Sequence, residues 1–372
     1  MLVRSGTWFW VTADESDSDD YQSMVEPLVE SLRGDPRVLN VISPEQNDFW
    51  TNQLTVFPDR NRSTRHGIAS GSDGLNILCL SNPIAFKVRV PKKNQHAYGG
   101  TPDIPSDTYW VAWNGVAVFV LWEQGQYEIP ISGGHVVADI LRDALKNSGS
   151  DLYVQSCSPG CEYMFLHQTM RIIEDATIDD YEVRPGSGTQ EVLVVFEALD
   201  GPDLQVVWVA LTVGSALGNF AEFKNYGRRL IDLENECRQD LGHLLTHFAE
   251  HARIVNSGWR PRALSRRWYA RGWRKEARSL VADVWLALAN IEAIKRSWDQ
   301  ERMNVADSEE FQPLFASDFS RDVITIDALR VEPISENVNQ IAGWLNNHSV
   351  VMATGLGALA GGAAGSIATL LG

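Results

Sequence analysis

The residues with the strongest potential for catalysis are a cysteine and a histidine, Cys157 and His135. Cys157 stands at the end of an apolar segment predicted as a strand, residues 152–157, and Ser-Pro-Gly follows it as a turn. A thiol becomes a nucleophile when a neutral imidazole removes its proton. Cys157 therefore needs a histidine next to its thiol, either His135, at the start of a predicted helix, or His66. The alternative is a small buried cysteine without chemistry, the more common role for such a residue.

Metal and phosphate sites have weaker support. Cys157, Cys161 and His167 form a C-x3-C-x5-H spacing, but zinc sites pair their ligands more tightly and need a fourth ligand. The acidic run from Asp14 to Asp20 precedes a predicted helix, and an acidic helix N-terminus accounts for it without a divalent cation. Neither glycine-rich type of phosphate-binding loop is present in the sequence. We therefore expect no metal and no cofactor.

Cations and aromatic rings alternate where a long helix is predicted to begin. Between Arg260 and Arg278 eight basic residues stand against the single Glu276. Four arginines share one helix face, Arg267, Arg271, Arg274 and Arg278, and Trp268 and Trp273 are interleaved with them in the sequence. Such a face suits contact with anionic lipid headgroups. Docking onto the acidic remainder of a neighbouring subunit is the rival interpretation, and nucleic acid comes third because the net charge is repulsive.

The segment Asp151-Leu-Tyr-Val-Gln-Ser-Cys-Ser-Pro-Gly160 resembles the strand-to-cysteine segment of caspase-like peptidases. The resemblance covers about ten residues and implies a cysteine hydrolase in which a histidine on a neighbouring strand end activates Cys157. At the comparable position this chain carries Trp113-Asn114-Gly115, and an asparagine cannot take the thiol proton. We therefore favour a role without catalysis and keep the hydrolase as an alternative.

The last 24 residues, 349–372, contain no ionisable side chain. As a helix they extend about 36 Å, enough to cross a hydrocarbon core of about 30 Å. Gly357, Gly361 and Gly365 recur at spacing four, which lets helices approach closely in a bilayer, whereas the few large apolar side chains make insertion marginal. The segment predicts a glycine-zipper transmembrane helix that associates with copies of itself. A buried small-residue helix in a soluble oligomer is the alternative.

Composition narrows the class of protein. The chain has 372 residues, 44% hydrophobic and 22% charged, which is typical of a packed globular protein with about two domains. A net charge of −16 argues against a protein that coats nucleic acid. Four cysteines without secreted spacing favour a reducing cytosol, and the N-terminus lacks the apolar core of a cleaved signal peptide. We expect a protein on the cytoplasmic side of the inner membrane with its C-terminal tail inserted.

Strands and helices alternate over residues 1–216, which predicts an α/β sheet domain with a sensor or regulatory role. The Asn114-Gly115 dipeptide between two apolar runs is a strong hairpin signal. The predicted strands are 7–13, 38–42, 75–90, 107–122, 152–157, 192–197 and 204–213, and the predicted helices are 24–32, 135–146 and 161–173.

From residue 217 the apolar residues follow steps of three and four. This spacing predicts a long helical hairpin over 217–304, divided near Ser257-Gly258. Residues 305–330 are predicted as a connector with a short strand at 323–326. Residues 331–348 are predicted as an amphipathic oligomerisation helix that leads into the transmembrane segment.

The expected fold class is α+β/α: an N-terminal α/β sheet domain, a long antiparallel helical hairpin and a C-terminal glycine-zipper transmembrane helix. This layout is similar to the membrane effectors of bacterial antiviral conflict systems, a resemblance of architecture alone. It implies a homo-oligomer that has membrane lipid as a partner, that an activating protein or a small signal molecule controls, and that permeabilises the membrane. The alternatives are a caspase-like cysteine hydrolase with a tail anchor and a subunit of a gated channel.

Overall fold

The computed structural model divides the chain into two compact units. Unit 1 comprises Met1–Ile231 and Ile294–Ala328, and unit 2 comprises Asp232–Ala293 and Leu329–Gly372. The structure describes residues 1–11, 21–44, 49–55, 74–95, 97–98, 101–102, 104–122, 135–154, 165–186, 191–197, 201–256, 261–307, 311–343 and 345.

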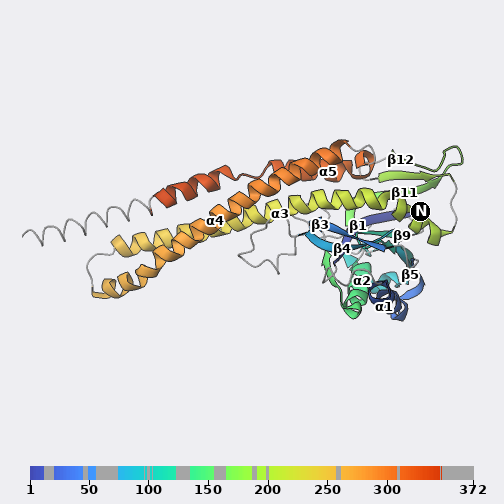
Figure 1. Cartoon of the computed structure of the whole chain (residues 1–372), viewed down its shortest axis with the longest axis horizontal. Helices are drawn as coiled ribbons and strands as arrows, with labels where there is room; N and C mark the ends of the chain where they lie inside the picture. The colour runs from blue at the N-terminus through green and yellow to red at the C-terminus, as the bar shows by residue number, and fades with distance from the viewer. Residues whose placement is uncertain are drawn as a thin grey trace, which may run out of the picture. The chain divides into compact units, whose positions relative to one another are not determined.

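Unit 1 contains the described strands, and long helices run through both units (Figure 1). The strands are β1 (Leu2–Val11), β2 (Val38–Ile42), β3 (Phe49–Thr55), β4 (Gly74–Leu80), β5 (Ile84–Arg89), β6 (Ala97–Tyr98), β7 (Thr101–Pro102), β8 (Thr108–Trp113), β9 (Ala117–Trp122), β10 (Asp151–Val154), β11 (Phe165–Glu174), β12 (Tyr181–Pro185) and β13 (Glu191–Phe196). The helices are α1 (Tyr21–Gly34), α2 (His135–Ser148), α3 (Pro202–Asn256), α4 (Pro261–Asp307) and α5 (Phe311–Asp327), with a 3-10 turn at Lys92–Asn94 and helical backbone over 332–343.

Strand β1 organises the sheet because it has neighbours along its whole length. Its first part, Leu2–Thr7, pairs with β9 and β11, and its second part, Trp8–Val11, pairs with β10 and β4. The main path runs β12-β13-β11-β1-β9-β8-β5-β2. Among the described strands only β11 and β13 pair in parallel. The N-terminal region is thus a mixed sheet with helices, consistent with α+β, and the parallel pairing typical of a repeated α/β alternation is confined to this one pair.

Helices cover both faces of the sheet in unit 1, and β1 shows why. Its side chains alternate, so Trp8 and Trp10 join the large core beneath α1 and α2, whereas Phe9 and Val11 join a smaller core that includes Ala221 of α3. In the large core Trp113 stacks on Trp10 with ring centroids 5.5 Å apart and donates its indole N–H to the Trp8 carbonyl at 2.9 Å. The strand is buried along its length because both faces are covered.

The predicted hairpin at Asn114-Gly115 is confirmed. Strands β8 and β9 pair antiparallel, with Trp113 opposite Val118, and Gly115 has a φ of +92°. The helices predicted at 24–32 and 135–146 are confirmed as α1 and α2, and the strands predicted at 38–42 and 192–197 are confirmed as β2 and β13. Local pattern decides these elements because each buries one regular face.

Three predicted elements are wrong. The helix at 161–173 is instead strand β11, whose described backbone finds partners in β1 on one side and β13 on the other. The strand at 204–213 is the start of α3. Its valines suggest a strand, but burial recurs at Val206, Val209 and Val213, a helical spacing, and Pro202 lies in the first turn.

The predicted short strand at 323–326 lies inside α5. Phe315 and Phe319 of this helix contact Phe220 and Phe223 of α3, with ring centroids 4.4 and 5.2 Å apart. Trp298 of α4 stacks on the same Phe223 at 5.5 Å. These aromatic contacts bury one face of α5, so that its β-branched residues are held in a helix.

Unit 2 contains the end of α3, the start of α4 and the helical backbone over 332–343. Phe248 of α3 contacts Trp273 of α4 edge to face at 5.5 Å, and His247 lies 3.7 Å from Glu276. The sequence numbers of these pairs run in opposite directions, as in two helices that lie antiparallel. The predicted amphipathic seam is buried at Ile334, Val338, Ile341 and Leu345.

Candidate functional site

The best-defined candidate site in unit 1 lies where the β8–β9 turn meets α3. The turn is held by three backbone hydrogen bonds: the N–H groups of Trp8, Trp10 and Leu80 donate to the carbonyls of Val116, Gly115 and Asn114 at 2.9, 2.7 and 2.8 Å. A Cβ atom on Gly115 would lie 1.9 Å from the Leu78 carbonyl oxygen. The turn is therefore fixed against both β1 and β4.

The side chain of Asn114 is oriented by the same turn. Its Oδ1 accepts hydrogen bonds from the N–H groups of Val116 and Ala117 at 3.0 and 2.7 Å. Because the oxygen occupies that position, the amide nitrogen Nδ2 must lie on the other side, and it sits 3.1 Å from the place where a Cβ on Gly214 would be. Asn114 thus presents two N–H donors toward α3.

A cavity of about 260 Å³ opens between this turn, the end of β4 and α3. Gly214 and Gly218 of α3 contribute no side chain to it, and a Cβ on Gly218 would only reach ordinary contact with Val116, at 3.5 Å. The described lining residues carry no ionisable group other than the Cys79 thiol: Cys79, Leu80, Ser81, Pro83, Asn114, Val116, Ala210, Leu211, Gly214, Ser215, Gly218 and Asn219.

Cys79 cannot serve this cavity as a nucleophile at neutral pH. Its side chain is buried, and burial raises the pKa of the thiol to about 12. The reactive thiolate is therefore scarce at pH 7, and the residue acts as a small apolar group. The cavity is thus suited to binding and not to thiol chemistry.

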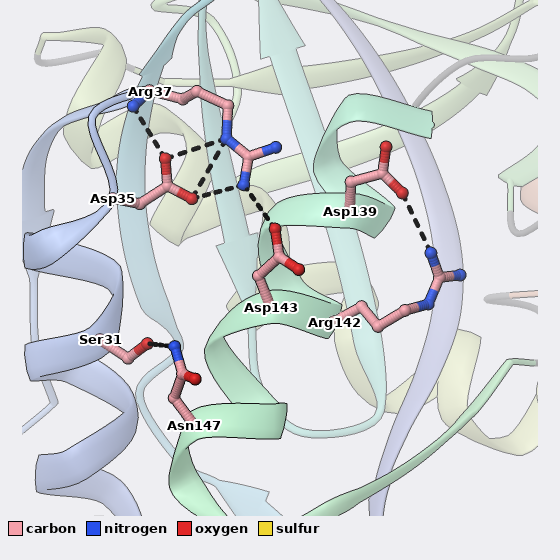
Figure 2. Close-up of polar contacts among 7 residues, drawn as sticks. All are labelled: Ser31, Asp35, Arg37, Asp139, Arg142, Asp143 and Asn147. Atoms are coloured by element: carbon pink, nitrogen blue, oxygen red, sulfur yellow. Dashed lines mark hydrogen bonds and ion pairs between the residues drawn. The ribbon is translucent and has the colours of Figure 1, made fainter.

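A second, more polar cavity of about 590 Å³ is lined by residues of α1, of the turn that follows it and of α2. Figure 2 shows the polar contacts in this region. Arg37 joins the two helices: its Nε and Nη2 donate to Asp35 at 2.9 and 2.6 Å, and Nη2 also donates to Asp143 of α2 at 2.9 Å. Nearby, Asn147 donates to the Ser31 hydroxyl at 3.3 Å.

The charges of this polar cavity neutralise one another. Hydrogen bonds to Asp35 raise the pKa of Arg37 above its ordinary value. Burial opposes ionisation of Asp35, but the bonds from Arg37 outweigh it and hold the pKa of that carboxyl below 3.8. Both groups are therefore charged at neutral pH and already paired, so neither of them is available as a general acid or base. The contacts of Arg37 with Asp35 and Asp143 hold α1 and α2 together above the sheet.

A buried charge cluster joins α3 to α5 in unit 1. Lys224 Nζ lies 3.5 Å from Asp322 Oδ2, and the two side chains are 4% and 1% exposed. Burial raises the pKa of Asp322 to about 6, although Lys224 favours its ionised form. Asp318, one turn earlier, is paired with Arg321. Two carboxylates and a lysine in an apolar contact are costly to assemble, which makes this cluster sensitive to substitution.

The predicted catalytic pair is not assembled within the described residues. Cys157 lies outside them, as do Cys161 and the polar loop that contains His66. His135 is the first residue of α2 and is half-buried. Asn114, at the position compared with the peptidase histidine, hydrogen-bonds its own turn.

The basic aromatic stretch is helical from its residue 261 onward. Arg267, Arg271, Arg274 and Arg278 all lie in α4, and the Arg278 side chain is exposed. Trp273 is half-buried and contacts Phe248 within unit 2. The placement of the other cations and of Trp268 is outside the described side chains, so their contact with lipid stays a prediction.

The first part of α3 carries an apolar surface that sequence reasoning missed. By length and composition, α3 is the one helix in the described part of the chain that could cross a membrane, and 56% of its apolar window is buried. Leu204, Trp208 and Leu211 recur at steps of four and three and are 43%, 51% and 41% exposed. Buried core helices share such composition, so the exposed face is the informative feature.

The residues of the turn cavity had a detectable signal in the sequence. Residues 204–221 contain no ionisable side chain, and Gly214 and Gly218 within them stand at spacing four. That pattern favours a helix in close contact with a neighbouring element, whereas the valines of residues 204–213 favour a strand. Within the described residues no group of three His, Cys, Asp or Glu side chains is placed to hold a metal ion. Comparison with family models, curated proteins and solved structures finds no match for this chain.

Proposed function

We propose that this chain is a homo-oligomerising membrane effector whose soluble region controls a C-terminal segment that inserts into a membrane and permeabilises it. The observation that carries the proposal is the presence of two uncharged apolar segments of membrane-spanning length, residues 204–221 and 349–372. The first of them presents Leu204, Trp208 and Leu211 to solvent, a surface that lipid or a second copy of the chain would cover.

Three further features support this role. The long helices α3 and α4 form the predicted antiparallel hairpin, and the seam of Ile334, Val338 and Ile341 precedes the tail. Gly357, Gly361 and Gly365 allow tail helices to pack closely in a bilayer. The arginine face of α4 attracts anionic lipid. In a bacterium such a protein acts at the cytoplasmic face of the inner membrane and fits the effector role in an antiviral conflict system.

The test separates a pore from a plain anchor. Gly361→Leu adds hydrophobicity but blocks close helix approach, so it should retain membrane binding and lose leakage. Ala363→Leu adds the same side chain about 200° around the helix from residue 361 and should retain both. Dye leakage from anionic liposomes is measured with each full-length protein, beside a pelleting assay for membrane binding.

Removal of the tail provides the second arm of the test. A form that ends at Asn347 should no longer cause leakage, because the tail is the permeabilising segment. The proposal is wrong if wild-type protein causes no leakage in any assembly state, or if Gly361→Leu leaks as much as wild type. In the latter case the tail is an anchor only.

A further inference from the structure

We propose that the cavity between the β8–β9 turn and α3 binds a small uncharged ligand that combines an apolar body with a hydrogen-bond-accepting oxygen, such as a carbonyl. The statement that this cavity receives the activating signal rests on the proposed function. The statement that it binds a small molecule does not. The cavity lies entirely within unit 1.

The hydrogen-bond donor of the site is the Asn114 amide. Two backbone N–H groups occupy its Oδ1 at 3.0 and 2.7 Å, which fixes Nδ2 on the side of α3. A donor held in place by a rigid turn loses little freedom on binding, so it favours a ligand oxygen at low entropic cost. A carbonyl or ether oxygen is the matching acceptor.

The lining selects an uncharged molecule. Among the described residues that line the cavity there is no Asp, Glu, Lys, Arg or His, and the buried Cys79 thiol stays protonated. A charged ligand would lose its hydration without gaining an ion pair. Leu80, Pro83 and Leu211 supply the apolar walls that small-molecule sites commonly have.

The size of the cavity limits the ligand. Its volume of about 260 Å³ lies just below the usual range for drug-sized sites. At about 30 Å³ per water-sized group, it holds roughly nine non-hydrogen atoms. Gly214 and Gly218 keep this space open, because a Cβ at either position would face Asn114 or Val116 at 3.1 or 3.5 Å.

A bound ligand would contact α3 and the sheet together. Ser81 and Pro83 lie between β4 and β5, and Ser215 and Asn219 lie in α3, so one molecule bridges elements that the sequence separates widely. Binding to this arrangement alone stabilises it by mass action. The site thus lets a small molecule control how firmly the first part of α3 is held on the sheet.

The test uses δ-valerolactam, a six-membered ring with one carbonyl, and piperidinium, the same ring with a positive charge. Saturation-transfer NMR with the full-length protein should show saturable binding of the lactam in the millimolar range, as expected for so few atoms, and none of piperidinium. Location is read from the side-chain amide of Asn114 in protein that carries isotope-labelled asparagine, where the signal is identified by its absence from Asn114→Asp: this amide signal should shift at the same lactam concentrations.

Two variants test the donor and the space. Asn114→Asp keeps the Oδ1 acceptor and the turn but replaces the donor, and should raise the lactam Kd at least about tenfold. Gly218→Leu fills the cavity and should abolish binding, whereas Gly242→Leu, on the same helix with nothing within 4 Å of its Cβ position, should not.

The inference is overturned if the lactam does not saturate wild-type protein below about 100 mM, if the Asn114 amide signal does not shift, or if Asn114→Asp binds as wild type does. The amide signal is followed in protein with an unaltered cavity, so this measurement remains decisive if Gly218→Leu fails to fold. None of these measurements involves leakage, so lactam binding can succeed where membrane permeabilisation fails, and the reverse.

Discussion

Gly115 and Gly149 show how single residues carry the fold of unit 1. Both have positive φ, +92° and +81°, a region that L side chains rarely adopt. They differ in space: a Cβ on Gly115 would lie 1.9 Å from the Leu78 carbonyl oxygen, whereas one on Gly149 has nothing within 4 Å. A side chain at either position would strain the local backbone. Only at Gly115 would it also clash with the backbone of a neighbouring strand.

This difference yields the first prediction. Gly149→Ala should lower the free energy of unfolding by about 1–2 kcal/mol, the cost of an alanine in the left-handed region. Gly115→Ala should cost at least about 3 kcal/mol or prevent folding, because β4 must move away from the turn. Urea unfolding followed by tryptophan fluorescence compares the two. Equal losses would show that the β8–β9 turn is not held against β4.

The buried pair Lys224 and Asp322 gives the second prediction. Lys224→Met leaves a buried carboxylate without its cation and should cost about 3–5 kcal/mol at pH 7. The double variant Lys224→Met/Asp322→Leu replaces the pair with apolar groups and should recover most of the lost stability. Urea unfolding measures both, and a double variant no more stable than the single one would contradict this account.

The same pair has a signed pH dependence. Burial raises the pKa of Asp322 from 3.8 to about 6, so the folded protein binds this proton more tightly than the unfolded chain. Its contribution to stability is therefore fully present below pH 3.8 and is lost as the pH rises through about 6. The stability difference between wild type and the double variant should fall by on the order of 3 kcal/mol from pH 4 to pH 7.

Among the elements, α3 carries the most distinctive surface. Its buried face includes Val206, Val213 and Leu217, and its opposite face begins with Leu204, Trp208 and Leu211 exposed. The helix thus exposes apolar surface beyond the face that it buries in its own core, and we propose that membrane lipid covers this surface.

The third prediction tests whether membrane lipid covers the exposed apolar surface of α3. Changing Leu204, Trp208 and Leu211 to Gln in the form ending at Asn347 should reduce its residual binding to liposomes at least about fivefold. Each change should alter the free energy of unfolding by no more than about 0.5 kcal/mol, because these side chains are solvent-exposed. Ile324→Gln on α5, at a position 70% exposed, is the control. Loss of stability without loss of binding would assign the stripe to the protein interior instead.

At the scale of the whole molecule, charge is distributed unevenly. The chain carries a net charge of −16, yet eight basic residues lie between Arg260 and Arg278. An acidic protein is repelled from anionic bilayers as a whole, so its orientation at a membrane depends on a local basic face.

The fourth prediction follows from this local charge. Changing Arg267, Arg271 and Arg274 to Glu should weaken binding of full-length protein to anionic liposomes, and added salt should reproduce part of the loss, because screening acts over about 10 Å at 0.1 M. Changing Lys92, Lys93 and Arg296 to Glu alters the net charge equally and should have a smaller effect. If both triple variants lose binding equally, net charge and not the arginine face determines membrane attraction.

The sequence by itself determined the elements whose burial is set by a regular local pattern. The Asn114-Gly115 dipeptide specifies a tight turn through its backbone preferences, and the apolar spacing of α1, α2 and most of α3 and α4 specifies helices. Composition alone also identifies the uncharged tail, residues 349–372, and the cationic stretch, residues 260–278.

Only the tertiary structure decided the segments whose local preference is ambiguous. Residues 165–174 form a strand because β1 and β13 supply backbone partners, and residues 204–213 form a helix in which Val206, Val209 and Val213 are buried at helical spacing. The turn cavity likewise required packing: Gly214 and Gly218 are ordinary helix residues until Asn114 lies against the first and Val116 against the second. The sequence shows which residues are candidates for chemistry, such as Cys157. A binding cavity, in contrast, arises from the space that distant elements leave between them.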